Sequence, residues 1–97
     1  MSYQDLIKSA NVVLVEFYAS WCPHCQRMMP IVADVKEKVE GQAKVAQFDI
    51  DQNAQLSDEE GVATIPTFIL YKDGREVWRQ SGEMPEEELL NRVKSVL

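Results

Sequence analysis

The sequence has few cysteines, few basic residues and no long hydrophobic run, and each shortage excludes a class of protein. Only 2 of the 97 residues are cysteines, whereas a secreted scaffold of this length that depends on disulfides usually has at least about four. The 10 lysines and arginines stand against 16 acidic residues, and the resulting net charge of −6 disfavours nucleic acid and anionic membranes as partners. No segment approaches the roughly 18 apolar residues that span a membrane. We therefore expect other proteins as partners.

The length fits a single domain, residues 1–97, that can bury a core without disulfide cross-links. Both cysteines are then free for chemistry. Two cysteines and one histidine cannot supply the four ligands of a zinc or iron–sulfur site without a second chain, so we expect no metal and no cofactor. We expect residues 1–10 to form an amphipathic segment rather than a signal peptide, and we expect a monomer in the cytoplasm.

Both cysteines lie in one motif, Trp-Cys-Pro-His-Cys at residues 21–25. The run before it, residues 12–19, is apolar and rich in β-forming residues, as in a strand buried on both faces. Pro23 suits the first turn of a helix, so Cys22 and Cys25 are expected at a strand-to-helix corner. Side chains three residues apart on a helix lie about 5–6 Å apart, which is compatible with a disulfide. The spacing predicts a disulfide that forms and breaks reversibly.

Strand-like and helical patterns alternate along the chain, which predicts an α/β fold. The expected helices cover residues 3–10, 23–40, 54–60 and 86–97, and the expected strands cover residues 12–19, 44–49, 67–71 and 76–80. A long helix separates the first two strands, so they should be parallel with a right-handed crossover. The last two strands flank Asp73 and Gly74, a strong signal for a hairpin.

The motif at residues 21–25 and the segment Ile-Pro-Thr at residues 65–67 resemble the thioredoxin family, and the match runs over nearly the whole chain. Family members carry a cis proline, an acidic residue in the strand before the motif and a glycine after the last strand, and Pro66, Glu16 and Gly82 match these positions. The resemblance implies a thioredoxin fold, with a four-stranded mixed sheet in the order 2-1-3-4 and helices on both faces. We expect this sheet to lack the strand with which a typical thioredoxin begins.

The resemblance also implies roles for the motif residues and the buried acid. Cys22 is the nucleophile, because the helix N-terminus favours its thiolate. Cys25 is the buried thiol that resolves the mixed disulfide. His24, together with Pro23, stabilises the thiolate further and makes the disulfide more oxidising. Glu16 exchanges a proton with Cys25, because burial raises the pKa of a carboxyl group.

By the same resemblance, the substrate lies in an apolar groove around an exposed nucleophile sulfur. The groove residues are Trp21, Thr64, Ile65, Pro66 and Gly82. The backbone of the substrate would pair with the residue before the cis proline.

Several of these residues have a plainer interpretation. Trp21 could pack in the core, Glu16 could face a sheet edge or pair with a lysine, and His24 could be an exposed loop histidine. Glu83, next to Gly82, would make one wall of the groove acidic and favour basic or neutral substrates.

The expected function is reduction of protein disulfides by dithiol–disulfide exchange, with an external partner that restores the dithiol. Pro23-His24, however, is similar to the pair in bacterial disulfide-introducing oxidants, whereas reducing thioredoxins usually have Gly-Pro. A disulfide oxidant or isomerase therefore remains an alternative, as does a non-catalytic interaction module. Gln47 stands where many thioredoxins have a lysine near the buried acid, which would alter the proton relay.

Overall fold

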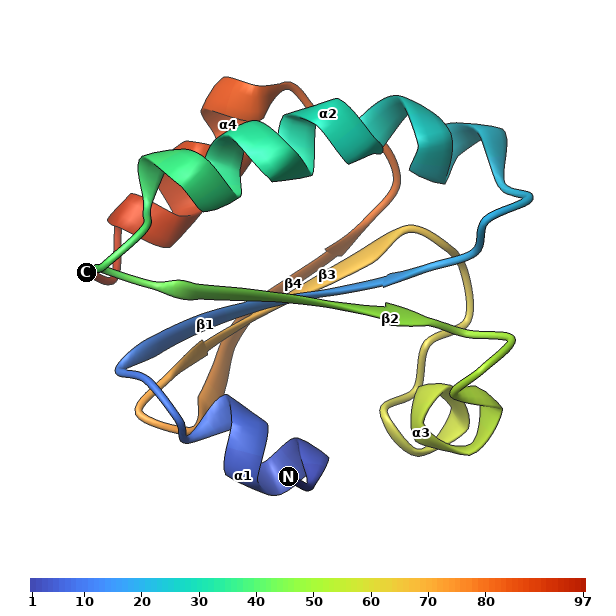
Figure 1. Ribbon diagram of the computed structural model, residues 1–97, viewed down its shortest axis with the longest axis horizontal. Helices are drawn as coiled ribbons and strands as arrows, with labels where there is room; N and C mark the ends of the chain where they lie inside the picture. The colour runs from blue at the N-terminus through green and yellow to red at the C-terminus, as the bar shows by residue number, and fades with distance from the viewer.

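Four strands form a mixed sheet in the order β2-β1-β3-β4 in the computed structural model, which describes residues 1–97 (Figure 1). The strands are β1 (Val12–Tyr18), β2 (Lys44–Asp49), β3 (Thr67–Lys72) and β4 (Arg75–Ser81), and the helices are α1 (Tyr3–Ile7), α2 (Pro23–Lys38), α3 (Ala54–Glu59) and α4 (Glu86–Lys94). β1 pairs in parallel with β2 and antiparallel with β3, and β3 pairs antiparallel with β4. The predicted fold and strand order are confirmed, although α1 ends at Ile7 and not at residue 10.

Strand β1 contributes to both halves of the core, because its side chains alternate between two covered faces. Figure 1 shows α2 and α4 over one face of the sheet and α1 and α3 over the other. Leu14 packs in the cluster that includes residues of α2 and α4, whereas Val15 and Phe17 pack in the cluster that includes Ile7 of α1. Every residue of β1 except Tyr18 is buried. A strand covered on both faces has to be apolar almost throughout, and this explains the continuous run in the sequence.

A two-residue turn joins β3 and β4. Asp73 has a φ of 52° and Gly74 a φ of 81°, the left-handed pair of a type I′ turn, whose twist matches that of the flanking strands. The hairpin is thus confirmed, and its strands reach closer to the turn than predicted, with β3 ending at Lys72 and β4 beginning at Arg75.

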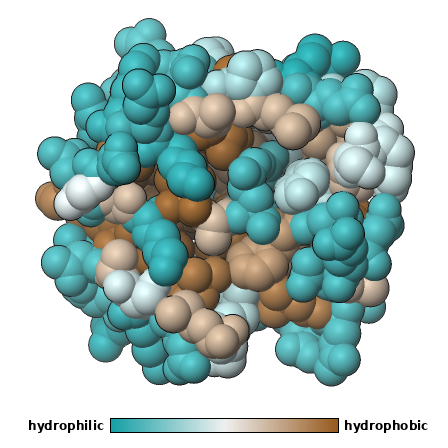
Figure 2. All heavy atoms as spheres, viewed as in Figure 1, coloured by the Kyte–Doolittle hydropathy of each residue, from teal (hydrophilic) through white to brown (hydrophobic).

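The edge strand β2 crosses the middle of the view in Figure 1, and in the same view Figure 2 shows hydrophobic residues gathered in the middle of a largely hydrophilic face. All residues of β2 are half-buried or exposed, whereas most residues of β1 and β3 are buried.

None of the helices combines the length and apolar character that crossing a membrane requires.

Phe68, in the central strand β3, has no exposed surface and packs in the core beneath α2 and α4. Phe68→Ala should lower the free energy of unfolding by about 3–5 kcal/mol, because it removes a large buried side chain and leaves a cavity. Urea unfolding followed by circular dichroism measures this. The matched control is Val77→Ala in the edge strand β4, where Val77 is 48% exposed, and it should change the free energy by less than about 0.5 kcal/mol. Equal losses in the two variants would contradict this assignment of the core.

Candidate active site

The Cys22 side chain caps the N-terminus of α2. Its backbone is extended, with φ −89° and ψ 116°, and its Sγ accepts a hydrogen bond from the backbone N–H of Cys25 at 3.3 Å. Pro23 is the first residue of the helix, where the missing N–H costs no hydrogen bond. A negative charge on this sulfur would meet both the N–H donor and the positive end of the helix dipole.

The Cys22 sulfur is less accessible than the sequence suggested. Cys22 is only 4% exposed, so the expectation of an exposed nucleophile is wrong. Cys22 clusters with Ala19 and Cys25, and Ile65 packs against this cluster. The Ile65 carbonyl oxygen lies 4.0 Å from Cys22 Sγ, and the Ile65–Pro66 peptide bond is cis. The segment before β3 therefore covers the sulfur.

Cys25 is one helical turn further along α2 and is 1% exposed, as predicted. Neither Cys22 nor Cys25 is in a disulfide. Burial, and then the neighbouring Cys22 side chain, raise the pKa of Cys25 well above its usual range. Cys25 therefore needs a proton acceptor close by before it can act as a nucleophile.

Glu16 is a buried carboxyl group on the α2 side of the sheet. The alternation along β1 places its side chain on the same face as Leu14, and it is 1% exposed. Gln47 is its neighbour in the parallel register of β1 and β2, and Gln47 Nε2 donates a hydrogen bond to Glu16 Oε1 at 2.8 Å. Oε2 has no hydrogen-bond partner. The alternatives of an edge position or a lysine partner are therefore wrong.

Burial raises the pKa of Glu16 to about 7, although the hydrogen bond from Gln47 acts in the opposite direction. A carboxyl group with this pKa can both accept and release a proton near neutral pH. The charge of Glu16 also contributes to the raised pKa of Cys25, so the two groups are close enough to interact electrostatically.

The residues predicted for the substrate groove come from three separate segments. Trp21 is 63% exposed, which excludes core packing, and its Nε1 donates to Asp51 Oδ2 at 2.8 Å. Pro66 is buried and Thr64 is exposed. Gly82 has a φ of +95°, and its N–H donates to the Pro66 carbonyl at 2.8 Å. That hydrogen bond joins the loop after β4 to the segment before β3.

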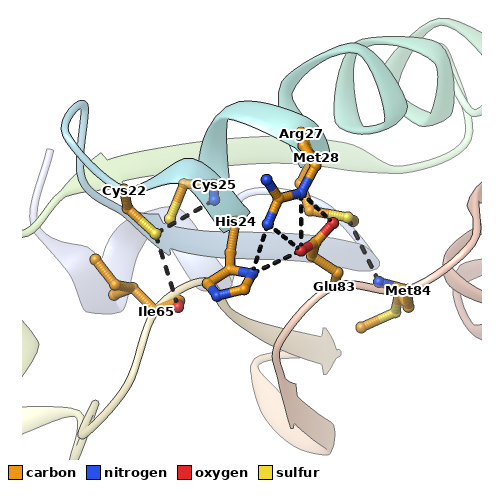
Figure 3. Close-up of polar contacts among 8 residues, drawn as sticks. All are labelled: Cys22, His24, Cys25, Arg27, Met28, Ile65, Glu83 and Met84. Atoms are coloured by element: carbon orange, nitrogen blue, oxygen red, sulfur yellow. Dashed lines mark hydrogen bonds and ion pairs between the residues drawn. The ribbon is translucent and has the colours of Figure 1, made fainter.

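His24 is turned toward an ion pair that the sequence did not predict. Figure 3 shows His24 and Arg27 of α2 pointing toward Glu83 in the loop after β4. His24 Nδ1 lies 2.6 Å from Glu83 Oε2, and Arg27 Nε and Nη2 donate to Glu83 at 2.8–3.0 Å. Hydrogen bonds from Arg27 and then His24 lower the pKa of Glu83 to about 2. The expectation that Glu83 makes one wall of the groove acidic is wrong, because the positive charge of Arg27 compensates the charge of Glu83.

The sequence analysis did not predict the role of Arg27, although a signal was present: Arg27 lies three residues after His24, on the same side of α2.

No group of three or more His, Cys, Asp or Glu side chains in the structure could hold a metal ion.

Comparison with known proteins gives consistent matches. A family model described as thioredoxin matches residues 1–95. Chloroplastic thioredoxin Y of Oryza sativa subsp. japonica is 35% identical to this chain, with 99% of this chain and 58% of the relative covered. The thioredoxin of Alicyclobacillus acidocaldarius subsp. acidocaldarius is 34% identical, with 99% and 91% covered. Among solved structures, a mutant thioredoxin from Halobacterium salinarum NRC-1 is 35% identical, with 96% of this chain and 80% of that chain covered and a TM-score of 0.88.

This chain thus spans little more than half of the length of the plant relative and most of the length of the bacterial one.

The raised pKa of Glu16 predicts a specific loss of stability with increasing pH. The unfolded chain releases this proton near the usual carboxyl pKa of about 4.5, whereas the folded protein keeps it up to about 7. Between these values the folded state binds more protons, so its stability falls as the pH rises, by about 3 kcal/mol in total. Glu16→Gln should remove this loss, and urea unfolding at pH 4.5 and pH 8 measures it.

The stability of Glu16→Gln relative to the original protein should therefore rise by about 3 kcal/mol from pH 4.5 to pH 8. Glu87→Gln, at an exposed position of α4, makes the same charge change and serves as the control. If the difference in free energy of unfolding between Glu16→Gln and the original protein were constant across this pH range, it would contradict the raised pKa of Glu16.

Proposed function

This chain belongs to the thioredoxin family, and on that premise we propose that it is a thiol–disulfide oxidoreductase that reduces disulfides in other proteins. One observation carries the proposal: the Cys22 sulfur caps α2, 3.3 Å from the N–H of Cys25, one turn from a second, buried thiol. Capping favours a thiolate at Cys22, and the spacing allows the second sulfur to reach it.

The first step is attack by the Cys22 thiolate on one sulfur of the substrate disulfide. A bond forms between Cys22 Sγ and that sulfur, and the other substrate sulfur leaves as a thiolate. Trp21, Thr64, Ile65, Pro66 and Gly82 form the proposed binding groove. The substrate has to approach beside the Ile65 carbonyl, which lies over the nucleophile.

The second step releases the reduced substrate. Glu16 takes the proton of Cys25, and the Cys25 thiolate attacks Cys22 Sγ. The Cys22–Cys25 disulfide forms, and the second substrate sulfur leaves as a thiolate, so that two electrons have passed to the substrate. Gln47 stabilises the charged form of Glu16 by its hydrogen bond but, unlike a lysine, brings no charge of its own.

A separate reductase must then return two electrons to the Cys22–Cys25 disulfide. No metal or other cofactor is part of the proposed reaction. Residues 1–97 would act as one thioredoxin-like unit and as a monomer, without a nucleic acid or membrane partner. The proposed compartment is the cytoplasm, because a reducing environment keeps a dithiol available.

A disulfide oxidant is the second candidate, and Pro23-His24 is the observation that favours it. An imidazole close to the Cys22 sulfur would stabilise the thiolate and therefore the reduced form. In the structure, His24 makes its hydrogen bond to Glu83 and not to the Cys22 sulfur, which favours the reductant.

Substitution of each cysteine should separate the two steps. Cys22→Ser should abolish reduction of a model protein disulfide, because no nucleophile remains. Cys25→Ser should still attack but not resolve, so a one-to-one mixed disulfide with the substrate should accumulate and be detected by mass spectrometry. Undiminished reduction by Cys22→Ser would refute the mechanism. Loss of reduction together with unchanged partner binding would leave the interaction module as an additional role.

The reduction potential decides between reductant and oxidant. We expect a value near about −270 mV, as for thioredoxin, rather than between about −180 and −120 mV, as for isomerases and oxidants. Equilibration in glutathione buffers at pH 7, with the free thiols alkylated and counted by mass spectrometry, gives the potential. A value in the higher range would favour the oxidant, and the absence of any redox transition would exclude both enzymes.

A further inference from the structure

The cluster of His24, Arg27 and Glu83 lies beside the redox motif and belongs to neither step of the proposed reaction. Glu83 binds the other two residues: its Oε2 accepts from His24 Nδ1 at 2.6 Å and from Arg27 Nη2 at 2.8 Å. A carboxylate can only accept, so Nδ1 carries a proton when it bonds to Glu83, whereas a guanidinium can only donate, so an unprotonated Nδ1 accepts instead from Arg27 Nη2, 3.0 Å away. In both arrangements Nδ1 is turned toward the Glu83–Arg27 pair. The polar edge of the imidazole that contains Nδ1 is therefore directed at Glu83 (Figure 3).

Glu83 is held on both sides by backbone hydrogen bonds. The N–H of Gly82 donates to the Pro66 carbonyl at 2.8 Å, and the N–H of Met84 contacts Met28 Sδ at 3.5 Å. Met28 and Met84 are buried. The loop is thus attached both to the cis-proline segment and to the α2 helix that carries His24, so Glu83 presents its carboxylate from a fixed position.

The hydrogen-bond contacts of the Cys22 sulfur, by contrast, are with backbone atoms. It accepts from the N–H of Cys25 and lies 4.0 Å from the Ile65 carbonyl oxygen, and it makes no hydrogen bond with His24. An imidazole stabilises a neighbouring thiolate only when its N–H or its positive charge faces the sulfur. The contacts with Glu83 and Arg27 turn Nδ1 toward that pair, and the carboxylate compensates positive charge at this position.

We propose that Glu83 is a positioning residue that holds His24 against Arg27 and away from the Cys22 sulfur, and thereby makes the Cys22–Cys25 disulfide less oxidising than the Pro-His pair alone would make it. The proposal rests on the proposed redox function. It explains how a chain with Pro23-His24 between its cysteines can act as a reductant.

The test is the equilibrium of the protein with glutathione at pH 7. The Cys22–Cys25 disulfide takes up two electrons and two protons from two glutathione thiols, which join as glutathione disulfide. Glu83→Gln keeps the size of the side chain and an oxygen that accepts from Arg27, but removes the charge. It should shift the equilibrium toward the dithiol by about 3- to 10-fold, which corresponds to about 14 to 30 mV at 29.6 mV per tenfold change.

A double-mutant cycle tests whether the shift caused by Glu83→Gln depends on His24. In the His24→Ala background, Glu83→Gln should shift the equilibrium by less than about twofold. A full shift in that background would show that Glu83 acts on the sulfur directly and would overturn the positioning role. No shift in the background that retains His24 would overturn it as well.

Glu37→Gln is the matched control, because it removes the same charge from an exposed position of α2. It lies 15 residues beyond Cys22, about 22 Å along the helix, well outside the Debye length of about 8 Å at physiological salt. It should leave the equilibrium unchanged, and a shift equal to that of Glu83→Gln would refute the local effect. Reduction of a model protein disulfide by the original protein, measured in parallel, tests the proposed function independently of Glu83.

Discussion

The hydrogen bond from the Cys25 N–H to the Cys22 sulfur is the contact on which the site depends. Helix N-termini usually take an oxygen of Ser, Thr, Asp or Asn as their cap, and here a sulfur has that place at 3.3 Å. The core of the protein fixes its position, because β1 ends just before the motif and α2 packs its buried face on the sheet. A negative charge on the Cys22 sulfur would therefore meet the same helix terminus that the fold requires.

Burial of Glu16 lowers the stability of the folded protein above neutral pH, but it supports the proposed reaction. A carboxyl group in the central strand, with Oε2 unpartnered, is costly to ionise, and the protein would be more stable above neutral pH with an uncharged side chain there. The same burial brings the pKa of Glu16 to about 7, where a proton can be exchanged with Cys25. Gln47 compensates only part of the cost, through Oε1. A destabilising feature in the core thus serves the proposed reaction.

The surroundings of the two sulfurs are built from segments far apart in the chain. The carbonyl of Ile65 lies 4.0 Å from the Cys22 sulfur, and Gly82 joins the loop after β4 to Pro66. Through this loop, Glu83 reaches Arg27 and His24 on α2. The motif therefore does not act with its own residues alone, since a loop about 60 residues later determines how its histidine is oriented.

The sequence by itself determined the order of the elements, the hairpin and the motif at the strand-to-helix corner, because each depends on local periodicity and turn preferences. The apolar run at 12–19 and the Asp73-Gly74 turn needed no information from elsewhere. Only the tertiary structure decided that Cys22 is covered, that Glu16 pairs with Gln47 and that Glu83 binds Arg27 and His24. Strand register and loop packing bring together groups that are 31 to 59 positions apart in the sequence. Local sequence patterns do not reveal contacts between residues so far apart in the chain.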